Sequence, residues 1–353
     1  MPQPSPHVIG CFGFVVVAVS LAFLNGLVHS APANASPVSK KLLLIAHRGA
    51  SGYAPEHTLA AYKLAIEQGA DFVEQDLQLT RDGRLICLHD PDLARTTNVK
   101  EIFPDRAAER DVEGGGVKKR GWYSIDFTLA EIKQLDAGSW FNRANPFIAD
   151  GAYVGQRIPT LEETIEFIGG RAGLYIELKH YPFYKSLGQD VASLTAAVLK
   201  ARGLDKSGDR VFIQSFSKES LLRMKEIAPG YRRVQLLPME GGGREDSRRI
   251  TGALAKEIAG YAQGVGPDMR MVNGRGDVQT LHKAGLLVHP YTFRGLTTAS
   301  ARLPLDERQQ NGLTTREQVI NDIRLFVGFE IDGGFTDYPD VWKAATGTNM
   351  KQR

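Results

Sequence analysis

Short apolar runs recur along the chain, and the first three contain ionisable residues or end beside them. These runs cover residues 42–46, 72–79 and 85–88. The second run alternates as a β-strand does, with successive side chains pointing to opposite faces. We therefore expect Phe72, Glu74, Asp76 and Gln78 to share one face of a strand. The two carboxylates would then lie about 6–7 Å apart along the strand and would repel each other unless a cation lay between them.

Strand and helix patterns alternate along most of the remaining chain. A helix is predicted over 59–68, with Thr58 as its N-cap and Gly69 as the residue that ends it. Further strands are predicted over 174–180, 211–216, 233–237, 264–265, 286–293 and 328–332. Further helices are predicted from about 160 to 167 and over 190–202, 218–227, 251–261, 278–284 and 315–326. This order favours a closed parallel (β/α)8 barrel, the TIM barrel, over residues 40–345 and not an open sheet.

Residues 91–156 interrupt the alternation of strands and helices. The segment is polar, has three consecutive glycines at 114–116 and contains several aromatic residues. Residues 128–135 predict a short helix. We interpret the segment as a small insertion after an early strand, beside the site and without a core of its own.

The first 35 residues contain no Lys, Arg, Asp or Glu, and residues 8–28 are largely apolar. Small residues around Ala33 fit a cleavage site, so residues 1–35 are interpreted as a signal peptide that directs export to the periplasm or the medium. The alternative is an uncleaved membrane anchor, since the stretch is long enough to span a bilayer. After cleavage we expect no stable membrane insertion.

Composition narrows the function classes further. The formal net charge is only +3, and no basic stripe with interleaved aromatic residues is visible, so the sequence gives no argument for a nucleic-acid partner. Cys11 would leave with the signal peptide, and Cys87 would then have no intramolecular disulfide partner. Cys87 is interpreted as a small buried residue. The oligomeric state stays open.

The active site of a TIM barrel lies at the carboxyl ends of its strands. If the run at 85–88 is a parallel neighbour of the first two strands, histidines and carboxylates meet at one edge. Alternation in 175–180 places Glu177 and Lys179 on one face and His180 on the other. The ionisable residues expected at the strand ends are His47 and Arg48, Glu74 and Asp76, His89 and Asp90, and Glu177 and Lys179.

Three of these residues form a candidate metal site. Glu74, Asp76 and Glu177 offer carboxylate oxygens without a thiolate, a set that suits one hard divalent cation, Ca²⁺ or Mg²⁺. The alternative is a buried structural network in which these acids pair with Arg48 and Lys179. The two histidines can exchange protons near neutral pH, and an arginine fork binds anionic oxygens. Together these groups predict cleavage of a phosphate ester.

Seven blocks of the sequence resemble the signature of the glycerophosphodiester phosphodiesterase family, most closely its exported members. The resemblance covers roughly residues 42–341, and the blocks are HRGASGYAPEHT, GADFVEQDLQLTRDG, LHDPDLARTT, RIPTLEE, YIELKH, VHPYTFR and GGFTDYPD. It implies a TIM barrel with a small insertion. It also implies metal-dependent hydrolysis of small glycerophosphodiesters, such as glycerophosphocholine and glycerophosphoethanolamine, to sn-glycerol 3-phosphate and an alcohol.

The same resemblance implies roles for individual residues. His47 and His89 would be the general acid–base pair, Arg48 and Lys179 would contact phosphate, and the three carboxylates would bind the metal. His57 stands where many members carry Asn and is left outside the catalytic set.

Residues after the last predicted strand are less clear. Phe335 either walls the substrate pocket or packs at the top of the barrel. The acids of FTDYPD are expected to cap the final helix, and His289 is expected to pack inside the barrel.

Two rival functions remain open. One is a lyase or phospholipase D of the sphingomyelinase D kind that acts on intact or lyso-phospholipids. The other is an anion-binding barrel without turnover.

Overall fold

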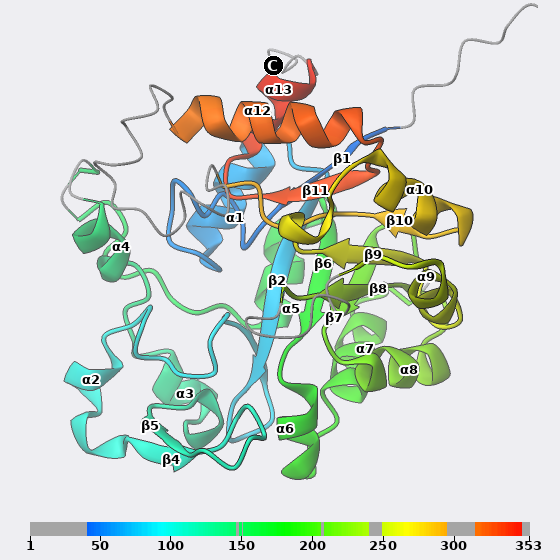
Figure 1. The fold of residues 1–353 in the computed structure, drawn as a ribbon. Helices are drawn as coiled ribbons and strands as arrows, with labels where there is room; N and C mark the ends of the chain where they lie inside the picture. The colour runs from blue at the N-terminus through cyan, green and yellow to red at the C-terminus, as the bar shows by residue number, and fades with distance from the viewer. Residues whose placement is uncertain are drawn as a thin grey trace, which may run out of the picture. The chain divides into compact units, whose positions relative to one another are not determined.

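Eight parallel strands form the wall of a barrel in the computed structural model (Figure 1). The structure describes residues 41–145, 148–149, 151–205, 208–239, 249–294 and 315–347. The parallel strands neighbour one another in the order β10-β9-β8-β7-β6-β2-β1-β11. Their bounds are β1 Leu43–Ala46, β2 Phe72–Leu79, β6 Gly173–Leu178, β7 Val211–Ser215, β8 Arg232–Leu237, β9 Gly264–Pro267, β10 Leu287–Val288 and β11 Gly333–Thr336.

The first and last strands of this order are joined through the segment that follows β10. Asp332 N donates to Val288 O at 3.0 Å, and Phe293 N donates to Phe335 O at 2.7 Å. A parallel bridge joins Phe293 to Thr336. These bonds close the wall, so the predicted TIM barrel is confirmed.

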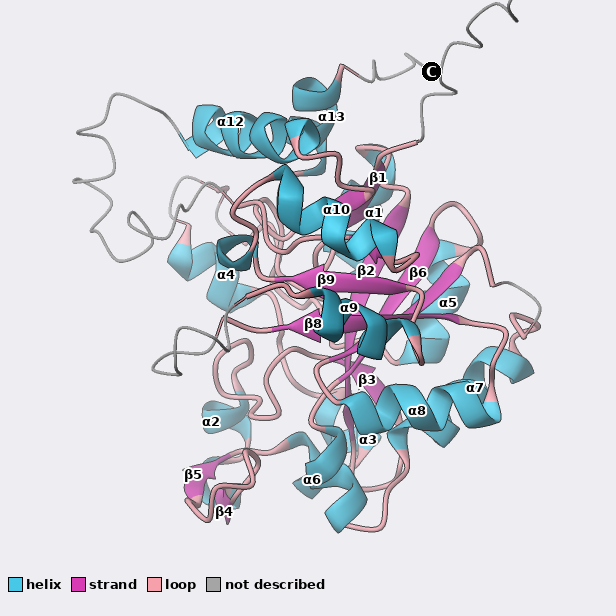
Figure 2. Cartoon of the chain, turned by 45° about the vertical axis from the view of Figure 1, so that its right-hand side comes forward, coloured by secondary structure: helices cyan, strands magenta, loops and turns pink. Residues whose placement is uncertain are grey.

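Helices lie around the outside of the strands (Figures 1 and 2). Those that alternate with the barrel strands are α1 Leu59–Glu67, α5 Leu161–Ile168, α6 Tyr181–Ser186, α7 Val191–Ala201, α8 Lys218–Ile227, α9 Gly252–Ala259, the 3₁₀ turn η4 Met269–Met271, α10 Arg275–Lys283, α12 Thr315–Gly328 and α13 Pro339–Thr346. The side chain of Thr58 accepts from Ala61 N, and Gly69 has a φ of +78°, so both predicted ends of α1 are confirmed.

The predicted signal segment lies outside the described residues and stays a prediction. Across the ranges given above, the helices are all too short or too polar to cross a membrane.

The third apolar segment forms a strand whose direction is opposite to the one predicted. β3, Leu85–Cys87, pairs antiparallel with the end of β2, with Leu77 opposite Cys87 and Leu79 opposite Leu85. A tight turn around Asp82 and Gly83 reverses the chain, and Gly83 has the left-handed φ of +73° that this turn needs. The run is therefore the return arm of a hairpin and not a parallel barrel strand.

The last strand also begins later than predicted. Residues 328–332 form the end of α12 and a turn, and β11 starts at Gly333. A Cβ at Gly333 would lie 2.7 Å from Leu43 O, and one at Gly334 would lie 2.6 Å from the Phe293 ring. Two glycines allow β11 to pack closely, although glycine has a low β-propensity, and this is why the pattern misplaced the strand.

The segment after β3 forms a lobe with its own small sheet and core. Its elements are α2 Val99–Ile102, η1 Pro104–Arg106, β4 Ala108–Arg110, β5 Lys119–Gly121, η2 Ser124–Asp126, α3 Leu129–Ile132 and α4 Ser139–Ala144. Phe127, Ile132 and Leu135 are fully buried there and pack with Ile86 and Leu88 of the hairpin. The sequence analysis expected no separate core in the insertion, and the buried cluster there is shared with the hairpin, which supplies one wall of it.

Side chains inside the barrel change character along its axis. Six of them form a buried, mostly aromatic layer: Ile45, Phe72, Tyr175, Phe212, Val234 and Phe335. The rings of Tyr175 and Phe212 stack with centroids 4.8 Å apart. Moving toward the carboxyl ends of the strands, the same faces next carry charged residues, because inward positions recur every second residue. The aromatic layer thus forms the floor beneath a polar site.

Candidate active site

A pocket of about 110 Å³ opens at the carboxyl ends of the barrel strands. All the predicted site residues except Asp76 are among those that line it. The lining residues are His47, Arg48, Glu74, His89, Glu177, Lys179, Gln214, Phe216, Leu236, Tyr291, Thr292, Arg294 and Phe335. Residues far apart in the sequence therefore meet at one rim, as the strand pattern predicted.

The two acids of β2 share the inner face of the barrel and are almost fully buried, each with 1% of its surface exposed. In the neighbouring strand Glu177 is the register partner of Asp76. Glu74 Oε2 accepts from Arg48 N at 2.8 Å, and Glu74 Oε1 accepts from Gln214 Nε2 at 3.2 Å. Burial raises the pKa of Glu74 well above its usual value, and the charge of Asp76 raises it further.

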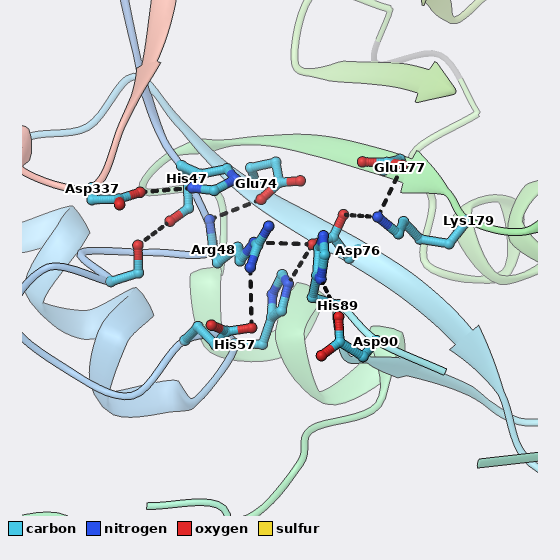
Figure 3. Close-up of polar contacts among 12 residues, drawn as sticks. His47, Arg48, His57, Glu74, Asp76, His89, Asp90, Glu177, Lys179 and Asp337 are labelled. Carbon is cyan, nitrogen blue, oxygen red and sulfur yellow. Dashed lines mark hydrogen bonds and ion pairs between the residues drawn. The ribbon is translucent and has the colours of Figure 1, made fainter. Parts of the chain in front are cut away.

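Asp76 lies beside the cations of Arg48 and Lys179 and beside the ring of His57 (Figure 3). Its Oδ2 is 3.3 Å from Arg48 Nε and 2.9 Å from His57 Nε2, and its Oδ1 is 3.8 Å from Lys179 Nζ. Burial alone would raise the pKa of Asp76, but the charge of Lys179 and the hydrogen bond with His57 outweigh burial and hold the pKa well below its usual value.

His57 is a site residue that the sequence analysis set aside. It is 3% exposed, its Nδ1 hydrogen-bonds with the Tyr62 hydroxyl at 2.9 Å, and its Nε2 faces Asp76. Ligand atoms of His57, Glu74 and Asp76 all lie within 4.8 Å of one another. These residues offer one nitrogen and two carboxylate oxygens as ligands, which are donor types that bind divalent cations. A cation there would also offset the repulsion between the two buried carboxylates.

An unusual backbone conformation brings His57 to this place. Its φ is +58°, in the left-handed region, and its N donates to the carbonyl of Arg48, whose own φ is +57°. Such conformations cost energy in residues with a Cβ and concentrate at functional sites. The hydrophobic pattern contains no sign of them.

Glu177, the third predicted ligand, lies next to Lys179 and does not belong to the cluster of His57, Glu74 and Asp76. Its Oε1 is 3.4 Å from Lys179 Nζ. Burial raises the pKa of Glu177 to about 8, and Asp76 adds to the increase. Its role as a metal ligand stays a prediction.

His47 hydrogen-bonds with a carboxylate that follows β11, the strand beside β1. Its Nδ1 hydrogen-bonds with Asp337 Oδ1 at 2.7 Å, and its backbone N donates to Thr336 O at 3.0 Å. Burial, with a smaller contribution from Arg48, lowers the pKa of His47 to about 4. With Nδ1 held in this way, Nε2 is the ring nitrogen left for the proton exchange that the sequence predicts.

His89 reaches the same pocket from the hairpin. Its Nδ1 hydrogen-bonds with Asp90 Oδ1 at 2.5 Å (Figure 3). Gln78 Nε2 donates to the His89 carbonyl at 2.7 Å. Burial lowers the pKa of His89, although its side chain is 31% exposed. Both predicted proton carriers therefore have the same arrangement, an imidazole whose Nδ1 is bound to a carboxylate.

The acids of the FTDYPD block do not cap the final helix as predicted. The N-cap of α13 is Tyr338 and has no side-chain capping bond. Asp337 instead bonds with His47 and lies 3.6 Å from Arg294 Nε. Asp340, in the first turn of α13, accepts from the Tyr53 hydroxyl at 2.8 Å. Asp337 and Arg294 are thus two further site residues that the sequence analysis missed.

The remaining candidate residues are buried, and of these Phe335 lines the pocket. Phe335 is 1% exposed and belongs to the aromatic floor as well as to the lining, so its two readings are compatible. His289 packs inside the barrel, where its Nδ1 hydrogen-bonds with the Tyr175 hydroxyl at 2.9 Å. Burial raises the pKa of Cys87 to about 12, which keeps its thiol protonated and agrees with a packing role.

Proteins of known family resemble this chain in sequence. A model of the glycerophosphoryl diester phosphodiesterase family matches residues 47–341. A glycerophosphodiester phosphodiesterase of Bacillus subtilis strain 168 is 37% identical over 336 residues, which are 95% of this chain and 93% of the relative. One from Haemophilus influenzae is 34% identical over 311 residues, covering 75% of this chain and 82% of the relative.

Solved structures resemble it as well. The crystal structure of a glycerophosphodiester phosphodiesterase from Agrobacterium tumefaciens strain C58 has a TM-score of 0.59 and 27% identity, covering 86% of this chain and 100% of that one. A phosphodiesterase from Oleispira antarctica in complex with the product sn-glycerol-3-phosphate has a TM-score of 0.60 and 25% identity, with coverages of 87% and 97%. Since the family model spans most of the sequence and the site residues lie within it, the chain belongs to the glycerophosphodiester phosphodiesterase family.

Proposed function

We propose that this enzyme hydrolyses small glycerophosphodiesters, such as glycerophosphocholine and glycerophosphoethanolamine, to sn-glycerol 3-phosphate and an alcohol. The observation that carries the proposal is the convergence of His47, His89, Arg48 and Lys179 on one pocket beside buried carboxylates. Membership of the family supports it, and so does the product bound to the Oleispira antarctica relative.

The cations of the pocket bind the anionic end of the substrate. Arg48 extends from the end of β1 and is 15% exposed, and Lys179 follows β6 and is 11% exposed. A guanidinium fork and an ammonium group on two walls hold the phosphate oxygens and fix the orientation of the scissile bond. Phe335 and the floor beneath it give the glycerol carbons an apolar surface.

The two histidines move the protons. One takes the proton from the attacking oxygen, and the other donates a proton to the departing alcohol oxygen as its bond to phosphorus breaks. We propose that the attacking oxygen is the 2-hydroxyl of the substrate's own glycerol, so that water opens the resulting cyclic phosphate in a second step. This route makes selectivity depend on the glycerol end of the substrate.

A divalent cation fits beside Glu74 and Asp76, with His57 or Glu177 as a further ligand. Bound there, it would supply positive charge that offsets the charge developing on the phosphate. We propose Ca²⁺ or Mg²⁺, because carboxylates dominate the donor set.

The function is tested by measuring release of sn-glycerol 3-phosphate in a coupled assay over a panel of headgroups. We expect activity with glycerophosphocholine, loss of activity after EDTA treatment, and recovery when Ca²⁺ or Mg²⁺ is added back. Full turnover in the chelated enzyme would remove the cation from the proposal. Faster cleavage of lysophosphatidylcholine than of glycerophosphocholine would favour the lyase or phospholipase D alternative, and binding without any product would favour an anion-binding barrel.

A further inference from the structure

A continuous set of ion pairs lies behind the pocket and links two of its walls. Glu56, in the loop between β1 and α1, accepts from both terminal nitrogens of Arg95, with Nη1 to Oε2 at 3.0 Å and Nη2 to Oε1 at 2.7 Å. Glu56 Oε1 also accepts from Arg48 Nη1 at 3.2 Å. Arg95 Nε donates to Asp90, the carboxylate that holds His89. Two acids, Glu56 and Asp90, with Arg95 between them, thus join the guanidinium of Arg48 to the imidazole of His89.

Neither Glu56 nor Arg95 lines the pocket, so their effect on the reaction must pass through residues that do. The Glu56 side chain is only 12% exposed, whereas that of Arg95 is 42% exposed. Burial alone would raise the pKa of Glu56, but the hydrogen bonds from Arg95 and the charge of Arg48 lower it to about 2. Glu56 therefore stays anionic as the shared counter-ion of two arginines.

The geometry of the Glu56–Arg95 pair restricts the movement of both side chains. Two parallel N–H···O bonds between a guanidinium and a carboxylate fix direction as well as distance. The partners are 39 residues apart and come from different loops, one after β1 and the other after β3. Arg48 N and the His89 carbonyl each also bond with a side chain of β2, so the pair adds a connection between the two segments to those made through that strand.

We propose that Glu56 and Arg95 are positioning residues that fix the phosphate-binding Arg48 relative to the proton-transferring His89, an inference that rests on the proposed function. The alternative is a structural role in which the pair only fastens the insertion to the barrel. The two roles differ in one respect: a positioning effect on His89 disappears when the imidazole is absent, and a structural effect does not.

A double-mutant cycle separates the two roles. Arg95→Lys keeps the charge and removes the fork, and we expect kcat for glycerophosphocholine to fall on the order of 10-fold or more. In a His89→Ala background the same change is expected to alter kcat by less than about 2-fold. Equal losses in the two backgrounds, or an Arg95→Lys rate within about 2-fold of the wild type, would overturn the inference and leave the proposed function intact.

Glu56→Gln tests the other end of the pair. It keeps the shape of the side chain and removes the charge that holds Arg48, so we expect the KM for glycerophosphocholine to rise together with a fall in kcat. The matched control is Arg106→Lys, since Arg106 Nη1 pairs with Glu131 at 2.8 Å within the insertion and away from the pocket. We expect the control to keep both kinetic constants, and losses equal to those of Arg95→Lys would favour the structural role.

A structural measurement makes the test independent of turnover. Crystal structures of the wild type and of Arg95→Lys are expected to differ in the orientation of the His89 ring and in the distance between His89 and Arg48. Unchanged positions would contradict the inference even if the wild type hydrolysed no glycerophosphodiester, a result that would separately refute the proposed function.

Discussion

The two histidine–aspartate pairs of the pocket are alike in chemistry and different in origin. His47 ends a barrel strand, and its partner Asp337 is 290 residues away, brought beside it because β1 and β11 are neighbours. His89 ends the arm of a hairpin, and its partner Asp90 is the next residue. The first pair exists only when β11 pairs with β1, whereas the second forms between adjacent residues at the end of the hairpin. The His47 side chain is also better buried, at 11% exposed against 31% for His89.

Removing either imidazole should have the largest effect and tests whether the two pairs are equal partners in the chemistry. We expect His47→Ala and His89→Ala each to lower kcat on the order of 10²- to 10⁴-fold, because each removes a proton-transfer group. The coupled sn-glycerol 3-phosphate assay measures the loss, and circular dichroism checks the fold. His282→Ala, on α10 and outside the pocket, is the control and should keep its rate. A near-normal rate in either variant would remove that histidine from the mechanism.

Neutralising the partner acids should have a smaller effect and should separate the two pairs. We expect Asp337→Asn to lower kcat on the order of 10- to 100-fold, equivalent to a charge-assisted hydrogen bond worth about 1.5–3 kcal/mol. Asp90→Asn should cost less, since that pair is more exposed to water. Parallel kcat measurements on the two variants decide the order. A larger loss of kcat in Asp90→Asn would show that burial does not determine how much each histidine–aspartate pair contributes to the rate.

The smallest expected effect is a difference between the two histidines in how the free energy of unfolding depends on pH. The pKa of folded His47 is about 4, against 6.5 ordinarily. Between these pH values the unfolded chain binds a proton on His47 that the folded protein does not, so the free energy of unfolding falls as the pH falls through this window. The contribution is at most about 3 kcal/mol. Below pH 4 both states are protonated and the loss is complete.

Urea denaturation between pH 4 and 7, in EDTA, measures this contribution. We expect His47→Gln to flatten the fall in stability between pH 6.5 and 4. His89→Gln should flatten it less, because the more exposed His89 is less strongly desolvated. Curves for His47→Gln and the wild type that stay parallel across the range would show that burial of this imidazole has no energetic consequence.

Much of the barrel and of the site could be predicted because both depend on local periodicity. The two-residue period of β2 was enough to place Glu74 and Asp76 on one inner face, and the same period in β6 added Glu177 and Lys179. Thr58 and Gly69 marked the ends of α1 through their own backbone chemistry. Each of these features is encoded within a few residues of where it acts.

The features that were missed depend on contacts beyond that range or on backbone strain. The contact between Asp337 and His47 follows from strand order, which no local pattern contains. His57 contacts Asp76 only because its own backbone is left-handed, and β11 begins with glycines because Leu43 and Trp342 leave no room for a Cβ there. The direction of β3 was available in principle, since an Asp-Gly turn between two short strands favours a hairpin.

The hairpin also explains how the inserted lobe can be attached without disturbing the barrel. Both of its ends meet on β3: Leu88 N donates to Asp76 O at 2.9 Å at the exit, and Cys87 N donates to Pro159 O at 2.9 Å on the return. A bridge between Ile86 and Thr160 lies beside them. Because departure and re-entry are adjacent, a lobe of almost any length can be accommodated there at a closure cost that grows only slowly with length. This junction is therefore where relatives could exchange most of one lobe for another during evolution, and where a designer could graft a new one without changing strand register, provided that Arg95 and its contacts with Glu56 and Asp90 are kept.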